Sequence, residues 1–501
     1  MAVKQIGKEW TRQNTIKSIL YFFLHFMLLI TIGTVLLLGD KFAILPQYLR
    51  EYGATYLYAL FCAFMLVVIT YLYYFFEDKD AISSGKGITL IFVLLDLSFI
   101  VSWLIGNYVN VFARPVAFVA LMAFILIDRR SGIFLNIISA LLLFVVDTYA
   151  GGITVSNAYY SSLIIAFSAG MFAIFFCNRA RTRFHVVLVG MAIVVPVDVT
   201  IVLLEISNLV EGGVGAMNAV TNMVMNMGYG LFGGVTSTIL FLALLPLFEV
   251  MFNSLTVYRL RELTSSDARI LKMLKEKAPG TYNHSMVVAQ LAEASAAAIG
   301  EDMDYARAAA LYHDVGKLHN PEHFTENQGE YNLHDELTPE LSADIIRSHT
   351  RDGYKLIKAN HLPEFLADVA VQHHGTLPIR YFYAKALKMT DGELNIEDFS
   401  YTGPKPQTKI AAIVMIADAS EAAVRAVNAR KPDEVEKAIS KIIEERMDLE
   451  QFSECDITMV ELTKIRHALV STLSGVYHHR VKYPSIKYKR TEDGVTKGEN
   501  A

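Results

Sequence analysis

The sequence predicts an all-α fold in two parts, a polytopic transmembrane helical bundle followed by a cytoplasmic all-helical domain. Of the 501 residues, 53% are hydrophobic and only 19% are charged, which is too apolar for an ordinary soluble protein. Apolar runs long enough to cross a bilayer crowd the first 253 residues. Histidine is distributed the opposite way, with 12 of the 14 beyond residue 283. The two parts therefore meet near residue 255.

The apolar runs set the number of spans, because a helix needs about 20 apolar residues to cross roughly 30 Å of hydrocarbon. The first run is too long for a signal peptide and lacks a small-residue cleavage site. The fourth and fifth runs have the least distinct boundaries, since they are short and lie close together. We expect eight spans, over residues 18–39, 55–77, 87–106, 108–127, 132–149, 160–178, 184–206 and 226–253.

Lysine and arginine set the orientation of the spans, because they favour the cytoplasmic side in short loops. The loops near 150–159 and 207–225 contain neither residue. The segments on the other side carry Lys4, Lys8, Arg12, Lys17, Lys79, Lys86, Arg129, Arg130, Arg179, Arg181, Arg183, Arg259 and Arg261. With eight spans, both termini are expected in the cytoplasm of a bacterial cell, and the protein is expected in its plasma (inner) membrane.

Three aspartates, Asp96, Asp147 and Asp198, lie within the predicted spans, where ionisable side chains are costly and often functional. Such carboxylates could line a ligand cavity or a proton path. Hydrogen bonding between helices, or a position near the end of a span, would explain them more simply. We favour the second interpretation.

Beyond the last span, the chain has the pattern of a soluble helical domain. A helical connector is expected first, with Ser265 or Ser266 as the cap of its second portion and Pro279-Gly280 as its end. Apolar residues then recur at helical spacing, without a convincing alternating pattern of strands. The expected segments are 1–17 (cytoplasmic N-terminal segment), 18–253 (transmembrane region), 254–283 (connector), 284–485 (helical domain) and 486–501 (a polar, disordered tail).

The stretch LYHDVGKLHN, residues 311–320, sets a His-Asp pair at the end of an apolar helical run. A single pair proves little, because His334-Asp335 is a second one in the polar segment YNLHDELTPE, where a loop explains it. Further histidines and aspartates interrupt apolar helical segments, where an unpaired charge or imidazole is costly. Metal ligation would remove that cost, since imidazoles and carboxylates are good ligands for first-row metals. The candidate metal ligands are His284, His313, Asp314, His349, His373 and Asp418. His374 is expected beside them or facing a substrate, because neighbouring residues on a helix point in different directions.

The order of these residues, H…HD…H…HH…D, resembles that of the HD-domain metal phosphohydrolases. It is most similar to the membrane-bound branch in which a seven-span region precedes the HD domain, the PgpH-type cyclic di-AMP phosphodiesterases. The segments that carry the resemblance are EKAPGTYNHS, LYHDVGK, HNPEHFTENQ, RSHTRDG and QHHGTLPIRYFY. The resemblance implies that residues 284–485 form an HD domain.

Two features separate this chain from related proteins. Members of the branch usually carry a large extracytoplasmic domain after the first span, whereas here only the 15 residues GDKFAILPQYLREYG join the first two spans. Either the chain is a short natural variant or that domain was removed. The GYP signature of the soluble enzymes that cleave cyclic di-GMP is also absent, because GTLPIRYFY follows His373-His374.

The resemblance also implies a site with two divalent metal ions, iron or manganese rather than zinc. Paired cations neutralise an anionic phosphodiester and generate hydroxide from bound water. One ion would be held by His284, His313, Asp314 and Asp418, and the other by His349 and His373, with Asp314 bridging. The expected catalytic residues are Asp314, Lys317 and His374, with Lys317 acting on a phosphate oxygen or on the leaving group. The expected substrate contacts are Lys317, Asn327, Gln328, His374, Tyr381 and Tyr383, although a packing role fits both tyrosines equally well.

The function implied by the resemblance is that of a membrane-anchored phosphodiesterase that opens cyclic di-AMP to the linear dinucleotide pApA. One alternative is a phosphohydrolase of another cyclic dinucleotide or of a nucleotide polyphosphate. Another is a catalytically silent nucleotide receptor that controls the membrane region, although the complete ligand set argues against it. Cyclic di-AMP and the lipid bilayer are the expected partners, and a homodimer is compatible with the sequence. Neither DNA nor RNA is expected, because a net charge of −5 gives no electrostatic basis for binding them.

Overall fold

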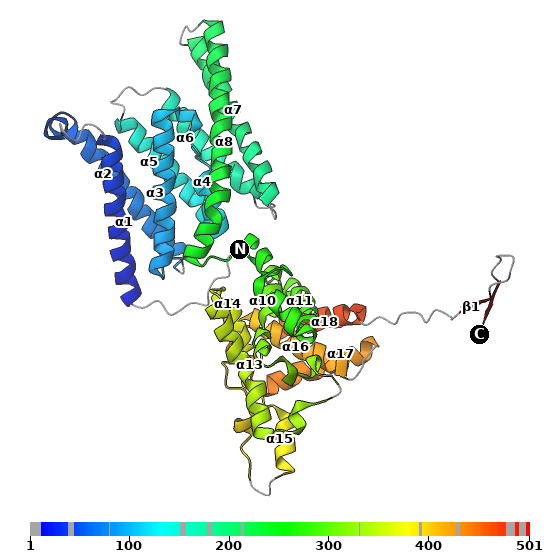
Figure 1. Ribbon diagram of the computed structural model, residues 1–501. Coiled ribbons are helices and arrows are strands. Elements are labelled where there is room, and N and C mark those ends of the chain that lie inside the picture. Colours follow the sequence, from blue (N-terminus) through cyan, green and yellow to red (C-terminus); the bar gives the residue numbers. More distant parts are fainter. Residues whose placement is uncertain are drawn as a thin grey trace. The chain divides into compact units, whose positions relative to one another are not determined.

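The computed structural model divides the chain into two compact units, Met1–Glu262 and Leu263–Ala501 (Figure 1). Apart from two short strands near the C-terminus, every described element is a helix. The predicted fold class is therefore confirmed. The residues that the structure describes are 12–38, 45–79, 81–150, 157–177, 183–211, 215–329, 331–389, 393–426, 431–476, 486–489 and 497–500.

The first unit is a bundle of apolar helices, and among its described residues seven helices are long and apolar enough to cross a membrane. Large apolar side chains point outward from it; Leu20, Phe61 and Val210, for example, are 66%, 58% and 76% exposed. Exposed apolar surface on this scale marks a membrane-facing protein. The helices are α1 (Arg12–Leu38), α2 (Leu45–Glu77), α3 (Gly85–Tyr108), η2 (Val111–Ala113), α4 (Phe118–Leu126), α5 (Arg129–Ala150), α6 (Asn157–Cys177), α7 (Arg183–Glu211) and α8 (Ala216–Phe252).

The prediction of a span-length helix over residues 108–127 is wrong. This segment forms the short η2, a turn and the nine-residue α4. Its two ends nevertheless lie beside opposite ends of α5, because Arg114 hydrogen-bonds to Asp147 and a Cβ atom at Gly132 would touch Phe124. These two α5 residues are about 22 Å apart along the axis, at 1.5 Å per residue. The segment thus runs antiparallel to most of α5 without being one continuous helix.

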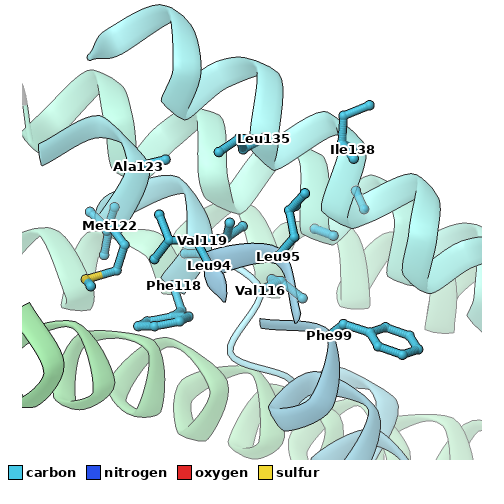
Figure 2. Packing of buried hydrophobic residues seen from close by; sticks show 14 of the residues in the cluster. Leu94, Leu95, Phe99, Val116, Phe118, Val119, Met122, Ala123, Leu135 and Ile138 are labelled. Atoms are coloured by element: carbon cyan, nitrogen blue, oxygen red, sulfur yellow. The ribbon is translucent and has the colours of Figure 1, made fainter. Parts of the chain in front are cut away.

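Burial explains why an interrupted helix is tolerated here. Phe118, Val119 and Met122 of α4 have no exposed surface, and Figure 2 shows them packed among Leu94 of α3 and Leu135 of α5. Non-helical backbone at membrane depth is stable only where protein surrounds it. The helices around this segment bury it in the core of the bundle. The backbone N–H and C=O groups at the break between η2 and α4 are therefore shielded from lipid.

The three intramembrane aspartates have different environments. Asp147 accepts two hydrogen bonds from the Arg114 guanidinium, at 2.5 and 2.7 Å, and both side chains are less than 10% exposed. The predicted role in hydrogen bonding between segments is confirmed for Asp147. Both oxygens of Asp96 and Oδ1 of Asp198 are buried without a hydrogen-bond partner among the described residues.

The segment expected as one helical connector is divided. The helix α9 (Val257–Leu263) ends before a turn, and α10 begins at Arg269. The expected capping by Ser265 or Ser266 is wrong, because Ala268 is the N-cap and provides no side-chain cap. Ser265 instead accepts a hydrogen bond from the backbone N–H of Asp267, within the turn. Pro279 then starts the next helix, where its missing N–H is tolerated in the first turn.

The second unit is a helical domain built around α16, which packs against α11, α12, α14, α17 and α18. Residues 411–417 of α16 are almost fully buried, so this helix lies in the core. The helices of the unit are α10 (Arg269–Lys277), α11 (Pro279–Ile299), α12 (Met303–Tyr312), η3 (Val315–His319), η4 (Pro321–His323), η5 (Thr325–Asn327), η6 (Leu333–Asp335), α13 (Pro339–Ala359), α14 (Glu364–Gln372), α15 (Arg380–Leu387), η7 (Ile396–Phe399), α16 (Lys409–Ala426), α17 (Pro432–Asp448) and α18 (Met459–Val476).

The segment expected as a disordered tail, 486–501, includes two short described strands, and its disorder stays a prediction. The strands β1 (Ile486–Lys489) and β2 (Lys497–Asn500) pair in an antiparallel ribbon.

Candidate metal centre

The predicted ligands come together from five helices that are distant in sequence. His284 lies on α11, His349 on α13 and Asp418 on α16. His313 and His373 are the C-cap residues that directly follow α12 and α14. Ends of helices suit this purpose, because a side chain there can point along the axis into a space that several helices surround. All five side chains are buried.

Asp314 reaches this cluster because η3 packs closely on α13. A Cβ atom at Gly316 would collide with the backbone carbonyl of His349, so only glycine permits the approach. The approach brings Asp314 Oδ1 to 3.4 Å from Nε2 of His349. The glycine of the HDVGK motif is therefore a packing requirement of the site.

The two oxygens of Asp314 face different pairs of histidines. Oδ2 lies 3.3 Å from Nε2 of His313 and 3.8 Å from Nε2 of His284. Oδ1 lies 3.4 Å from Nε2 of His349 and 3.7 Å from Nε2 of His373. The carboxylate thus stands between two imidazole pairs, which is the position that a bridging ligand requires.

Each of the two histidine pairs around Asp314 has one more side chain beside it, Asp418 in one case and His374 in the other. Asp418 Oδ1 lies 2.9 Å from Nε2 of His284 and 3.8 Å from that of His313. We call these three residues, with Oδ2 of Asp314, the carboxylate pocket. His374 can point a ring nitrogen toward the other pair, because one ligand atom from each of the three histidines lies within 4.8 Å of the others. The imidazole pocket comprises His349, His373 and His374, with Oδ1 of Asp314.

Four histidines make a hydrogen bond through Nδ1, at the rear of the ring, on the side away from Asp314. These bonds fix which nitrogen faces the centre. Nδ1 donates to a backbone carbonyl three residues earlier, at 2.6 Å in His313, 2.5 Å in His349 and 2.9 Å in His373. Nδ1 of His284 pairs instead with Glu421 Oε2, at 2.6 Å. A carbonyl oxygen only accepts, so the proton is on Nδ1 and Nε2 is the nitrogen available to a metal.

Unsatisfied atoms at the centre fit a bound cation. Nε2 of His313 and Oδ1 of Asp314 are buried and make no hydrogen bond to any described residue. Buried polar atoms are rarely left unpaired, and a cation would satisfy both. Neutral imidazoles and carboxylates are also the ligands that iron and manganese accept. The donor set therefore fits a metal ion, and three groupings of ligand atoms are close enough to hold one: His284, His313 and Asp418; His313, Asp314 and His373; His349, His373 and His374.

The charges differ between the two pockets. Burial alone lowers the pKa of His313, but Asp314 and Asp418 outweigh it and raise that pKa to about 10. Burial is likewise outweighed at His284, whose pKa is raised by its hydrogen bonds to Asp418 and Glu421. Without metal, the His313 imidazole therefore holds an extra proton at neutral pH, and the pKa of His284 is shifted in the same direction.

The histidines of the imidazole pocket are neutral. Burial lowers the pKa of His349 and lowers that of His373 well below its usual range. Burial also lowers the pKa of His374, to about 3. The ring of Tyr401 covers His374 at 4.4 Å between ring centroids. These imidazoles are thus ready to bind a cation without first losing a proton.

Lys317 lies at the edge of the carboxylate pocket. Its Nζ is 2.7 Å from Asp314 Oδ2 and 2.8 Å from Glu326 Oε1, and 4.9 Å from the centre of the Phe324 ring. Burial lowers the pKa of a lysine, but the two carboxylates outweigh that effect and raise it. Lys317 is therefore a fixed positive charge beside the site.

Asn327 and Gln328, two of the predicted substrate contacts, have hydrogen bonds of their own. The Asn327 amide accepts from the backbone N–H of Thr281 and donates to its hydroxyl, at 3.1 and 2.8 Å. Gln328 donates to Asn332 at 3.3 Å. The contacts of Asn327 tie the η5 turn to the start of α11. A direct role of either residue toward substrate stays a prediction.

The two predicted substrate tyrosines lie on α15. Tyr381 is 66% exposed and contacts the ring of Phe382. The Tyr383 hydroxyl donates to the backbone oxygen of Leu394 at 3.3 Å, and its ring packs on Phe399. Among the described residues, neither tyrosine makes a hydrogen bond or ring contact with the candidate metal ligands. For Tyr383, the structure therefore favours a packing role over a substrate contact.

Sequence reasoning missed three residues at the site, the buried Glu421 and the half-buried Glu326 and Tyr401. A signal for Glu421 was present, because it follows Asp418 by three residues and so shares its helical face. Tyr401 had no such signal, since a loop pairing between its backbone N–H and the oxygen of Leu377 brings it back to the histidines. Contacts made by loops do not follow helical spacing.

His334, the histidine of the second His-Asp pair, is not the simple loop residue that its polar neighbours in sequence predict. It lies on η6 and is only 4% exposed. Its Nε2 donates to the backbone oxygen of His323 at 2.8 Å, and its ring lies 5.1 Å from that of Phe382. The residue is structural, and polar neighbours in sequence did not reveal its burial.

Comparison with known proteins matches both units of the chain. A family model described as "7TM receptor with intracellular HD hydrolase" matches residues 51–256. The HD domain model matches residues 281–423, which include every predicted metal ligand. Together they match the membrane unit and the helical domain in the order that the sequence predicted.

Two curated relatives carry the name cyclic-di-AMP phosphodiesterase PgpH. The protein from Listeria monocytogenes is 47% identical over 265 residues, 53% of this chain and 37% of the relative. The one from Bacillus subtilis is 34% identical over 433 residues, 85% of this chain and 59% of the relative. The chain thus spans between about a third and three fifths of the length of these relatives. A crystal structure of the L. monocytogenes PgpH HD domain in complex with cyclic di-AMP is 49% identical, with a TM-score of 0.41, and covers 43% of this chain and 99% of that one.

The membrane unit, the helical domain and the ligand order thus agree with one group of proteins. The chain belongs to the family in which a seven-span membrane region is followed by an intracellular HD hydrolase domain.

Proposed function

We propose that the chain is a membrane-anchored, metal-dependent phosphodiesterase that hydrolyses cyclic di-AMP to pApA. The observation that carries this proposal is the position of Asp314, whose two oxygens face two separate imidazole pairs. The activity named for the L. monocytogenes and B. subtilis relatives supports cyclic di-AMP as the substrate. The distribution of lysine and arginine supports a cytoplasmic HD domain and N-terminus.

The residues would divide the work between metal binding and substrate binding. Two divalent ions, iron or manganese, would neutralise the phosphodiester and lower the pKa of bound water. The carboxylate pocket would hold one of them, and His349 and His373 of the imidazole pocket would hold the other, with Asp314 shared and His374 left to face the substrate. The rear hydrogen bonds keep each Nε2 aimed inward, which limits the cost of ordering the ligands when an ion binds.

Lys317 and His374 are the residues we assign to the substrate. Lys317 holds its proton because Asp314 and Glu326 surround its ammonium group. A fixed positive charge suits contact with a phosphate oxygen better than proton donation to a leaving group. His374 is neutral and 22% exposed at its side chain, so it can exchange a hydrogen bond with a bound nucleotide.

The test is hydrolysis by the full chain, purified in detergent and loaded with Mn²⁺ or, without oxygen, with Fe²⁺. Cyclic di-AMP, cyclic di-GMP, a mixed cyclic dinucleotide and a guanosine polyphosphate are supplied separately, and chromatography resolves the products. We expect pApA from cyclic di-AMP at the highest rate. Faster hydrolysis of another nucleotide would replace the substrate assignment, and tight binding without any product would support the silent receptor instead.

A further inference from the structure

Glu421 differs from the other groups behind the histidines. Its carboxylate is 3% exposed and lies 2.6 Å from Nδ1 of His284, whereas the other three rear partners are neutral backbone carbonyls. It stands on α16 one helical turn beyond Asp418. The helix α16 therefore carries a candidate metal ligand, Asp418, and also Glu421, the group that orients a second candidate ligand, His284.

This carboxylate adds to a charge difference between the two pockets. The carboxylate pocket has Asp418 as a ligand and Glu421 behind it. Lys317 opposes them on the same side, but Glu326 is paired with that lysine at 2.8 Å and offsets its charge. Arg425 lies 3.5 Å from Glu421 but is 47% exposed, so water screens it.

The imidazole pocket has no carboxylate as close as that of the other pocket: Asp418 Oδ2 lies 3.9 Å from Nδ1 of His374, whereas its Oδ1 lies 2.9 Å from Nε2 of His284. Apart from its share of Asp314, its donors are the rings of His349, His373 and His374, two of which have backbone carbonyls behind them. A divalent cation gains more from anionic than from neutral ligands in a buried site, because the interior screens charge weakly. A carboxylate behind a histidine also makes that imidazole a stronger ligand.

We propose that Glu421 is a positioning residue that makes the two metal pockets unequal, so that the carboxylate pocket fills before the imidazole pocket. The inference rests on the proposed dinuclear site and deepens it. At a limiting supply of metal, the protein then holds one ion and lacks the second. Full activity requires a higher concentration of free metal than the first binding step does.

The experiment uses the metal-free full chain in detergent at pH 7, with Mn²⁺ as the probe. Electron paramagnetic resonance distinguishes free, isolated and exchange-coupled Mn²⁺, and calorimetry gives the affinity of each step. At one equivalent, the wild type should show isolated Mn²⁺; at two equivalents, a coupled pair. A coupled pair already dominant at one equivalent would overturn the unequal pockets.

Two substitutions and one control test the residue itself. Glu421→Gln keeps an acceptor for Nδ1 but loses the charge, and Glu421→Ala loses both. We expect the tight step to weaken about 10-fold and about 100-fold, within the range found for groups behind metal ligands, and the weak step to stay within about threefold. Glu461→Gln is the matched control, because Glu461 is also paired, to Lys409 at 2.7 Å, but lies at the start of α18.

The outcomes separate this inference from the proposed function. Unchanged tight binding in Glu421→Gln, or equal weakening of both steps, would overturn the role of Glu421. Circular dichroism confirms that each metal-free variant is folded, and the glutamine variant carries the test if the alanine variant is not. Failure of the proposed function would appear differently, as a fully loaded wild type that forms no pApA.

Discussion

Replacing Asp314 with asparagine tests the shared carboxylate most directly, because the side chain keeps its shape and loses the charge that both pockets use. Removing one preorganised electrostatic contact from a reacting centre costs about 10²–10³ in rate. Asp314 faces two pockets, so we expect a loss of at least about 10³-fold in turnover, or about 4 kcal/mol at 1.36 kcal/mol per factor of ten. Bound metal should fall to one ion per chain or fewer.

The assay compares cyclic di-AMP turnover and metal content with those of Asp335→Asn. This control makes the same chemical change in the second His-Asp pair, where Asp335 is 66% exposed and lies 3.8 Å from Lys385. It should retain two ions and turnover within about twofold of wild type. The reasoning would be refuted by a folded Asp314→Asn protein that keeps two ions and more than a tenth of wild-type turnover.

Three further predictions concern other parts of the molecule. His334→Ala should lower the free energy of unfolding by about 1–3 kcal/mol, through a lost hydrogen bond and lost packing, while turnover of the folded protein stays within about threefold; urea denaturation and the hydrolysis assay measure both. Arg114→Gln should destabilise the membrane unit by about 3–5 kcal/mol, because it leaves a buried carboxylate unpaired, and the double variant Arg114→Gln/Asp147→Asn should recover most of the loss in a detergent-unfolding assay; equal stability of the single and double variants would contradict this pairing. Binding of metal at pH 7 should release protons, because the raised pKa of His313, about 10 without metal, means that a cation must displace a proton there. Apparent metal affinity should therefore rise with pH toward 10, and calorimetry in two buffers of different ionisation enthalpy detects the release; an identical heat in both would contradict it.

The sequence alone predicted the membrane bundle, the helical domain and the identity of the metal-binding candidates. Lengths of apolar runs report spans because hydrocarbon thickness sets the length of a crossing helix. Histidines and aspartates in apolar helices are conspicuous because burying them without partners is costly. The sequence did not predict that the fourth apolar run is interrupted. Apolar composition does not distinguish a continuous helix from a buried helix that is broken by a turn.

The tertiary structure decided how the candidates divide into two pockets. That Oδ2 of Asp314 faces His313 while Oδ1 faces His349 depends on the close packing of η3 on α13, which no local pattern encodes. Glu421 behind His284 and Tyr401 over His374 were likewise set by the packing of segments more than 25 residues apart. The sequence by itself determined which chemistry the chain can carry, because residue type and burial cost are local properties. Only the tertiary structure decided which atoms face one another, because those positions depend on contacts between segments that are distant in the chain.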